Sequence, residues 1–361
     1  MKQSHVIGLA AAAVIAVGGA VAVSLSGSDS SAPSANARVF PALAGKINDV
    51  ASLTVARKDE SITVARKGDA WVVPAKHDYP AAFDKVRRTL LELADLRPLE
   101  QKTSSPALFA ALELEDLSQA DAKSTLVTLK DANGGEILAA YVGKQRFGRG
   151  ASGDATYVRR ANSNETWLAK GRAQPEKGVI NWLDKNLADV ARERVSAITV
   201  VHADGSKVEA ARDKATDKNF TLKNPVPAGK KVKSEWDINN LASPFERLEL
   251  EDVRPLSEIL VVAGGPYAEV ATFDGQITRA DLVEADGQTW VKLSARHVEP
   301  VAALSEEEKK EGKLKSADDV KKDVETFNAR VATWAYRLPD WKTDNLRKKL
   351  SDLVEEDKKG S

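Results

Sequence analysis

VASLTVAR at Val50–Arg57 and VSAITVVH at Val195–His202 decide the fold, because each segment alternates apolar and polar side chains as a β-strand does. SITVARK at Ser61–Lys67 and AWVV at Ala70–Val73 continue the first alternation after short polar turns. Asn133-Gly134 between two later alternating runs is a strong signal for a two-residue hairpin. The sequence therefore predicts antiparallel sheet on both sides of its midpoint.

One helix is predicted after each set of strands. In both, apolar residues recur at +3, +7 and +10, which lines one helix face. The same tripeptide, Arg-Pro-Leu, follows both helices, at Arg97–Leu99 and at Arg254–Leu256. Matching order, face and tripeptide predict two related α+β modules, and chance similarity of short patterns is the alternative. The first face is Phe83, Val86, Leu90 and Leu93, and the second is Ile238, Leu241, Phe245 and Leu248.

The carboxy-terminal segment carries a longer helical pattern. Six apolar residues recur with 4-3-4-3-4 spacing between a capping residue, Ser316, and a stop, Pro339. A second helix with Leu346, Leu350 and Leu353 would complete a helical hairpin. We expect this hairpin to pack on the second module, and a partner-docking helix is the alternative. The six residues are Val320, Val324, Phe327, Val331, Trp334 and Leu338.

Val6–Val23 is an uncharged apolar run that follows Lys2. Its length lies between that of a long signal-peptide core and that of a short membrane-spanning helix. The positive flank predicts that residues 1–5 stay in the cytoplasm and that the body is exported. An uncleaved transmembrane anchor is the main expectation. A signal cleaved behind Ala20-Val21-Ala22 and a cytosolic apolar helix are the alternatives.

The expected fold class is α+β, with antiparallel sheet plus helix in each module. Residues 24–38 are rich in Ser, Ala, Gly and Pro and read as a flexible tether. The resulting organisation is an anchor at 1–23, the tether at 24–38, modules at 39–191 and 192–300, and a helical tail at 301–361.

Composition excludes several kinds of site. The 361 residues hold 53 Lys and Arg against 53 Asp and Glu, so the chain lacks the basic excess of nucleic-acid-binding proteins. With no cysteine there is no disulfide, thiolate metal site or cysteine nucleophile. The four histidines have no metal-binding spacing, and no G-x-S-x-G motif is present. We therefore expect no cofactor, no metal and no catalytic residue.

Gly148–Gly153 matches the G-x-G-x-x-G dinucleotide motif, but the residues that follow read as a strand rather than a helix. We expect a hairpin tip and no nucleotide. Five basic residues gather around the same loop and form a candidate patch for an anionic partner, with an ordinary solvated strand edge as the alternative. They are Lys144, Arg146, Arg149, Arg159 and Arg160.

A series of motifs resembles the domain-of-unknown-function family 4340 across nearly the whole exported chain. Members of that family are membrane-anchored bacterial proteins of unknown role, frequently found beside ABC-type transport systems related to gliding-motility transporters. The resemblance implies an accessory or interaction protein on the periplasmic side of the inner membrane, with transporter subunits as partners. A glycan-binding or lipid-headgroup-binding module is the alternative, and an envelope hydrolase comes third. The motifs are SITVARKGDAWVV (61–73), YPAAFDKVRRTLLELADLRPLEQKTS (79–104), TYVRRA (156–161), TWLAKG (166–171), NWLDKNL (181–187), DGQTWVKLSA (286–295) and WAYRLPDWK (334–342).

Overall fold

The computed structural model describes residues 37–148, 153–300 and 305–357. The expected anchor at 1–23 and most of the expected tether at 24–38 lie outside these residues. Among the described helices, none has the length and apolar character needed to cross a membrane. Contacts divide the chain into two compact units, one of residues up to Ser61 with Arg88–Pro175, the other of Ile62–Arg87 with the residues from Glu176 onward.

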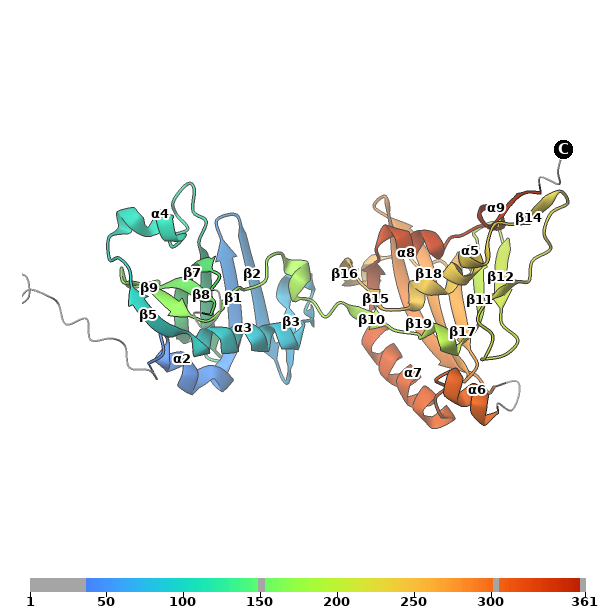
Figure 1. Cartoon of the computed structure of the whole chain (residues 1–361), viewed down its shortest axis with the longest axis horizontal. Coiled ribbons are helices and arrows are strands. Elements are labelled where there is room, and N and C mark those ends of the chain that lie inside the picture. Colours follow the sequence, from blue (N-terminus) through green and yellow to red (C-terminus); the bar gives the residue numbers. More distant parts are fainter. Residues whose placement is uncertain (1–36, 149–152, 301–304, 358–361) are drawn as a thin grey trace, which may run out of the picture. The chain divides into compact units, whose positions relative to one another are not determined.

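A nine-stranded antiparallel sheet has the order β4-β3-β2-β1-β6-β7-β8-β9-β5 (Figure 1). The predicted hairpin at Asn133-Gly134 joins β6 to β7, and Gly134 adopts the positive φ of 82° that such a turn requires. The strands are β1 (Val50–Arg57), β2 (Glu60–Lys67), β3 (Ala70–Val73), β4 (Tyr79–Pro80), β5 (Arg97–Gln101), β6 (Thr125–Asp131), β7 (Glu136–Arg146), β8 (Ala155–Arg160) and β9 (Thr166–Lys170).

The second sheet has eight antiparallel strands in the order β13-β12-β11-β17-β18-β19-β20-β16. Its strands are β11 (Val195–Val201), β12 (Lys207–Ala211), β13 (Thr221–Leu222), β16 (Asp252–Pro255), β17 (Tyr267–Thr272), β18 (Gln276–Ala285), β19 (Gln288–His297) and β20 (Trp334–Arg337). Two short pairs accompany it: β10 (Asn186–Ala188) with β15 (Leu248–Glu249), and β14 (Lys230–Val232) with β21 (Val354–Glu356).

The two large sheets share one strand order. In each, the first strand lies between its hairpin partner and a four-stranded meander, and the strand that follows the helix lies at the far edge beside the last meander strand. Thus β5 and β16, which carry the Arg-Pro sequences, occupy equivalent edges. Both first strands also have a register shift near their start, between Val50 and Ser52 and between Val195 and Ala197.

The helices between the strands differ more than the sheets do. Helix α3 (Phe83–Asp95) buries Val86, Leu90 and Leu93, but Phe83 is 60% exposed, so the predicted face begins one turn later than expected. In the second half, Ser234 caps α5 (Glu235–Asn239) through the amide of Asp237, and a 3₁₀ helix, Asn240–Phe245, continues it. The remaining helices are α2 (Pro41–Lys46), α4 (Phe109–Leu112), α6 (Glu306–Glu311), α7 (Ala317–Val331), α8 (Asp340–Asn345) and α9 (Leu350–Leu353).

The predicted carboxy-terminal helical hairpin is wrong. Helix α7 ends at Val331, and the next residues form β20, which pairs with β16 and β19. The tail groups with the second compact unit, which consists of Ile62–Arg87 and the residues from Glu176 onward. The expected packing is confirmed for α7, which lies against β19 and β18 with Val320, Val324 and Val331 buried (Figure 1).

Strand edges in the eight-stranded sheet are covered by asparagine side chains. The Asn328 amide on α7 donates to the carbonyl oxygen of Ala295 in β19 and accepts from its N–H, both at 2.8 Å. The Asn224 side chain donates to the carbonyl of Lys207 and accepts from the N–H of Glu209 in β12. Each amide thus replaces one residue of a neighbouring strand.

Candidate functional site

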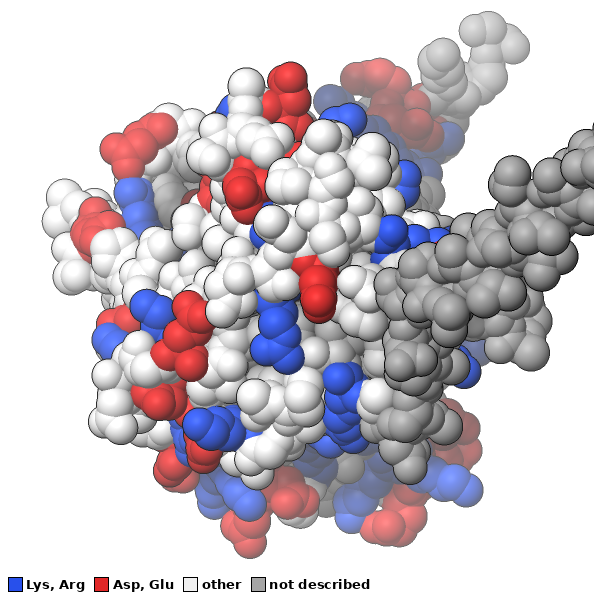
Figure 2. All heavy atoms as spheres, turned by 90° about the vertical axis from the view of Figure 1, so that its left-hand side faces the viewer, with Lys and Arg blue, Asp and Glu red and all other residues white. Residues whose placement is uncertain are grey.

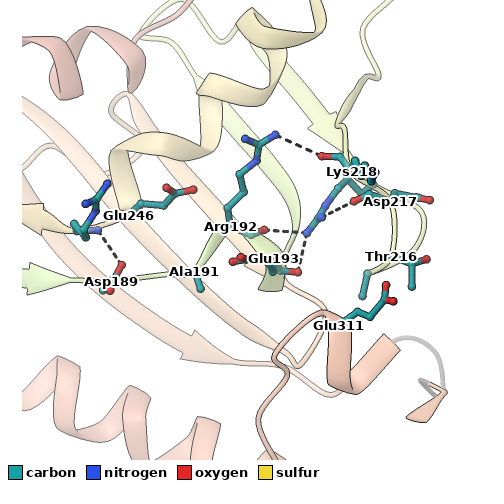
Figure 3. Close-up of a pocket in the computed structure, with 12 residues that line it drawn as sticks. Asp189, Ala191, Arg192, Glu193, Thr216, Asp217, Lys218, Glu246 and Glu311 are labelled. Carbon is teal, nitrogen blue, oxygen red and sulfur yellow. Dashed lines mark hydrogen bonds between the residues drawn. The ribbon is translucent and has the colours of Figure 1, made fainter. Parts of the chain in front are cut away.

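A cavity of about 640 Å³ opens within the second compact unit (Figure 3). Four segments line it: the residues around 189–193 before β11, the loop at 212–218 after β12, the turn at 246–247 before β15, and Glu311 at the end of α6. Five of the lining side chains are acidic and four are basic, and the lining includes only two apolar residues, Ala191 and Ala215. The cavity is therefore a charged groove, and we call it by that name below.

Arg212 holds the wall of the charged groove together. Its buried guanidinium donates to the carbonyl oxygens of Arg192, Glu193 and Val195 on one side and to that of Asp217 on the other. It also lies 4.8 Å from the ring centre of Phe220. Burial lowers the pKa of Arg212, and the nearby Arg192 lowers it further. Because all three of its nitrogens donate to backbone carbonyls within the fold, Arg212 is a structural residue and fixes the 212–218 loop against β11.

Arg192 and Glu246 present charges inside the charged groove. Figure 3 shows the carboxylate of Glu246 extending toward Arg192. Arg192 is half-buried, and the only hydrogen bond of its guanidinium in the described part of the chain is a long one, 3.4 Å, to the carbonyl of Lys218. Glu246 is half-buried as well, and burial raises its pKa, while the charge of Arg192 acts to lower it. The structure joins these two side chains by no ion pair within the residues it describes.

Glu193 is set apart from Glu246 by its surroundings. Its carboxylate accepts from its own backbone N–H and from Lys313 Nζ at 3.0 Å, and these bonds lower its pKa. The pKa values of these two carboxylates of the charged groove are thus shifted in opposite directions, that of Glu193 toward the ionised form and that of Glu246 toward the protonated form.

The turn that carries Glu246 is held in a strained conformation. Arg247 has φ of 40°, a left-handed value that costs free energy outside glycine, and its N–H donates to Asp189 at 3.0 Å. On the other side, the buried Lys342 Nζ donates to the carbonyl oxygens of Ser243, Pro244 and Glu246. Burial lowers the pKa of Lys342. These contacts fix the direction in which the Glu246 side chain leaves the backbone.

The five basic residues predicted as an anionic-partner patch lie in different surroundings. Lys144 and Arg146 are exposed on β7, and Arg149 lies outside the described residues. Arg159 is only 2% exposed, so its place in an exposed patch is wrong. Its guanidinium bonds to the carbonyl of Leu114 and to Asp116, between the rings of Phe109 and Tyr141.

Arg160, the last of the five, is half-buried and donates to the carbonyl of Val39 above the ring of Phe40. Figure 2 shows basic and acidic side chains interspersed on the face that it draws. Gly148–Gly153 leads into β8, as expected for a hairpin tip, although residues 149–152 are outside the described part.

Three of the four histidines lie in the described part of the chain. His77 is exposed, with Nε2 3.7 Å from Glu258, and His202 and His297 are half-buried. His5 lies outside the described residues. Within the residues that the structure describes, no group of three His, Asp or Glu side chains is placed to hold a metal ion.

No sequence motif pointed to the charged groove. Arg192 and Glu246 lie 54 positions apart, in segments without regular periodicity, and they meet only because β10 and β15 pair beside them. A weak signal was the high density of charge in ARER (191–194) and FERLE (245–249) next to buried apolar residues.

Comparison with known proteins gives one match. The model of the family described as Domain of unknown function (DUF4340) matches residues 71–261, which is more than half of the chain. No curated protein and no solved structure matches the chain. The match extends over the edge strand β5, most of the nine-stranded sheet, and the segments that supply Arg192 and Glu246.

Proposed function

The chain belongs to the domain-of-unknown-function family DUF4340, and from that premise we propose that it is a non-catalytic, membrane-anchored accessory protein that binds a small polar ligand. The charged groove is the observation that supports a binding role. A flat apolar docking surface would favour an interaction subunit instead, and a concave site with converging polar groups favours a ligand. Glu246 and Arg192 converge in this way, which favours the ligand-binding form of the accessory role.

We further infer that the two large sheets descend from one repeated module. The shared strand order, the equivalent edge strands β5 and β16, and the register shifts at Val50 and Val195 support this inference. The second copy carries α6 and α7 between β19 and β20, where the first has only residues 161–165 between β8 and β9. The charged groove uses Glu311 from that insertion, so this feature belongs to the second copy alone.

Anchoring is proposed from the amino-terminal sequence. The uncharged run Val6–Val23 behind Lys2 supports a single membrane span, with the body in the periplasm of a bacterium. The resemblance stated above supports a place beside an ABC-type envelope transport system. A binding protein tethered close to a bilayer could there present its ligand, or report its presence, to a transporter.

The proposal is tested by two measurements on the full-length chain in a maltoside detergent. A thermal-shift screen against amino acids, lipid head groups and sugars should give ligands that raise the melting temperature, an effect that Glu246→Gln reduces and the distant Glu269→Gln leaves intact. Purification from its native membranes should bring down subunits of an ABC-type transporter. A chain that no class of ligand stabilises and that purifies alone would overturn the proposal.

An envelope hydrolase is the second candidate, favoured by one observation. Glu246 and Glu193 are carboxylates in one groove with pKa values shifted apart, which is how acid and base are divided in glycoside hydrolysis. Release of reducing sugar from peptidoglycan or glucan fragments, lost in Glu246→Gln, would favour the hydrolase over the binding protein.

A further inference from the structure

Three charged side chains of the groove, of both signs, form no ion pair with any residue that the structure describes. The carboxylate of Glu246 accepts no hydrogen bond from any residue that the structure describes. The Arg192 guanidinium makes one long hydrogen bond, at 3.4 Å to the carbonyl of Lys218, and lies 6.0 Å from the ring centre of Phe220. The side-chain guanidinium of Arg247 has no ion-pair partner among the described residues either, since Asp189 bonds only its backbone N–H. A carboxylate is thus left beside guanidinium groups without bonding them.

We propose that the charged groove binds a small zwitterion, whose cationic group contacts Glu246 and whose anionic group contacts Arg192. This inference rests on the proposed binding function and adds the class of ligand.

The charged side chains of the groove argue against a ligand that is a simple anion or a simple cation. A free anion at Arg192 would also lie near Glu193 and Glu246, and a free cation at Glu246 would lie near Arg192 and Arg247. Either ligand would leave one partly desolvated charge of the groove uncompensated, which costs free energy. A zwitterion compensates both signs with two charge-assisted contacts.

The lining and the size argue for a small, polar molecule. Cavities that hold small ligands have volumes of about 300–1,000 Å³, and they are usually mostly apolar. The charged groove falls within that range at about 640 Å³, but it has no aromatic side chain in its lining. A stacked sugar ring or an acyl chain would find little surface here. A molecule that contributes mainly charged groups would find many partners.

The groove is also built rigidly around these two positions. Arg212 fixes the backbone that carries Arg192, and Lys342 and Asp189 fix the turn that carries Glu246. Such preorganisation reduces the cost of ordering side chains when a ligand binds. The same ammonium and anion occur in a phosphoethanolamine lipid head group and in a free amino acid, so the test must separate these sources.

Isothermal titration of the full-length chain in maltoside detergent at pH 7 tests the proposal with four probes: O-phosphoethanolamine, L-alanine, ethanolamine and inorganic phosphate. We expect at least one zwitterion to bind about tenfold or more tightly than ethanolamine or phosphate. L-alanine binding points to amino acids. O-phosphoethanolamine binding, with retention on vesicles that contain phosphatidylethanolamine, points to the head group.

Two substitutions test which residue contacts the cationic group of the ligand and which contacts its anionic group. Glu246→Gln should weaken the zwitterion about tenfold or more and leave the weak binding of phosphate unchanged or improved, whereas Arg192→Gln should weaken the zwitterion and abolish phosphate binding. Glu269→Gln, outside the groove, is the matched control. If Glu246→Gln does not fold by circular dichroism, the shorter Glu246→Asp takes its place.

The possible outcomes distinguish failure of the zwitterion proposal from failure of the proposed binding function. A neutral sugar or a single-sign ion that binds as tightly as both zwitterions, with loss in Glu246→Gln or Arg192→Gln, would overturn the zwitterion but keep a binding function. Equal affinity of all groove variants for a zwitterion would also overturn it. A chain that binds no probe, and that no ligand in the thermal-shift screen stabilises, would overturn both.

Discussion

At the scale of single residues, buried polar groups stabilise the eight-stranded sheet. Arg194 and Asp274 form a bidentate ion pair with side chains that are 6% and 3% exposed. Gln276, Thr272 and the N–H of Lys315 complete the hydrogen bonds of the pair. Burial opposes the charge on Asp274, but the bonds from Arg194, Lys315 and Thr272 dominate, and its pKa is lowered. Both oxygens of the buried Asp274 carboxylate thus accept two hydrogen bonds each, the condition under which a buried charge is tolerated.

Asp274→Asn should therefore lower the free energy of unfolding at pH 7 by about 3–5 kcal/mol, because it leaves the Arg194 charge buried without a counter-charge. The control Asp213→Asn removes one side of the exposed pair with Lys223 and should change stability by less than about 1 kcal/mol. Urea unfolding of the three proteins checks both values. Equal effects of the two substitutions would contradict this account.

The same residue predicts an acid dependence. Because the pKa of Asp274 is lower in the folded chain than in the unfolded one, its stabilisation is present above the unfolded value, about pH 3.9, and is lost as the pH falls through the folded value. Stability measured between pH 5 and pH 2 should fall less steeply in Asp274→Asn than in the parent chain. Parallel curves for the two proteins would show that other carboxylates carry the acid sensitivity.

At the scale of elements, the sequence predicted strands better than helix ends. The alternating runs at Val50 and Val195 became β1 and β11 at the expected positions, because one sheet face is buried and alternation fixes the register. The helix predicted from the 4-3-4 spacing ends at Val331. Beyond it, Trp334 and Leu338 match the helical period by coincidence. Ala335, Tyr336 and Leu338 are the residues buried there, and β20 gains hydrogen bonds from β16 and β19 that no periodicity in one segment can reveal.

The prediction that Phe83 lies on the buried face of its helix was wrong for a related reason. Phe83 is the first residue of α3, and the apolar face of a helix is buried only where the sheet lies under it. The charged groove was beyond sequence analysis altogether, because Arg192 and Glu246 are brought together by pairing of short strands rather than by any local pattern.

Helix α7 should contribute stability through its buried face. Val320 is fully buried on the side that packs against the sheet, and Val320→Ala removes two methyl groups, which should lower the free energy of unfolding by about 1–2 kcal/mol. Glu325→Ala on the exposed side should stay within about 0.5 kcal/mol of the parent. Chemical denaturation of both variants tests this. A stable Val320→Ala variant would favour the partner-docking helix instead.

Asn328 should matter more than its surface position suggests. Asn328→Leu leaves the N–H and the carbonyl of Ala295 without partners, which should lower the free energy of unfolding by about 1–3 kcal/mol. The neighbouring Ala329→Leu, at an exposed position, is the control. Amide hydrogen exchange at Ala295 measures the effect directly, and unchanged protection in Asn328→Leu would rule out this role.

At the scale of the whole molecule, the amino terminus decides whether the chain is anchored to a membrane. We predict that Val6–Val23 remains attached, so that the mature chain begins at residue 1 or 2 and is extracted from membranes only by detergent. Mass spectrometry of the purified intact protein measures this. A mature chain that starts near Val23 or within residues 24–37 would show a cleaved signal instead of an anchor.

The asparagine side chains that cover strand edges in the eight-stranded sheet are synthesised after the strands that they cover. Asn224 lies 15 positions after the strand residue whose N–H it bonds, and Asn328 follows Ala295 by 33 positions. Because a chain is synthesised from its amino terminus, β19 is exposed before Asn328 is made, and its open edge can meanwhile pair with another copy. The open edge of β19 is therefore covered only once Asn328 has been synthesised. A chain truncated before residue 328 would leave that edge open permanently.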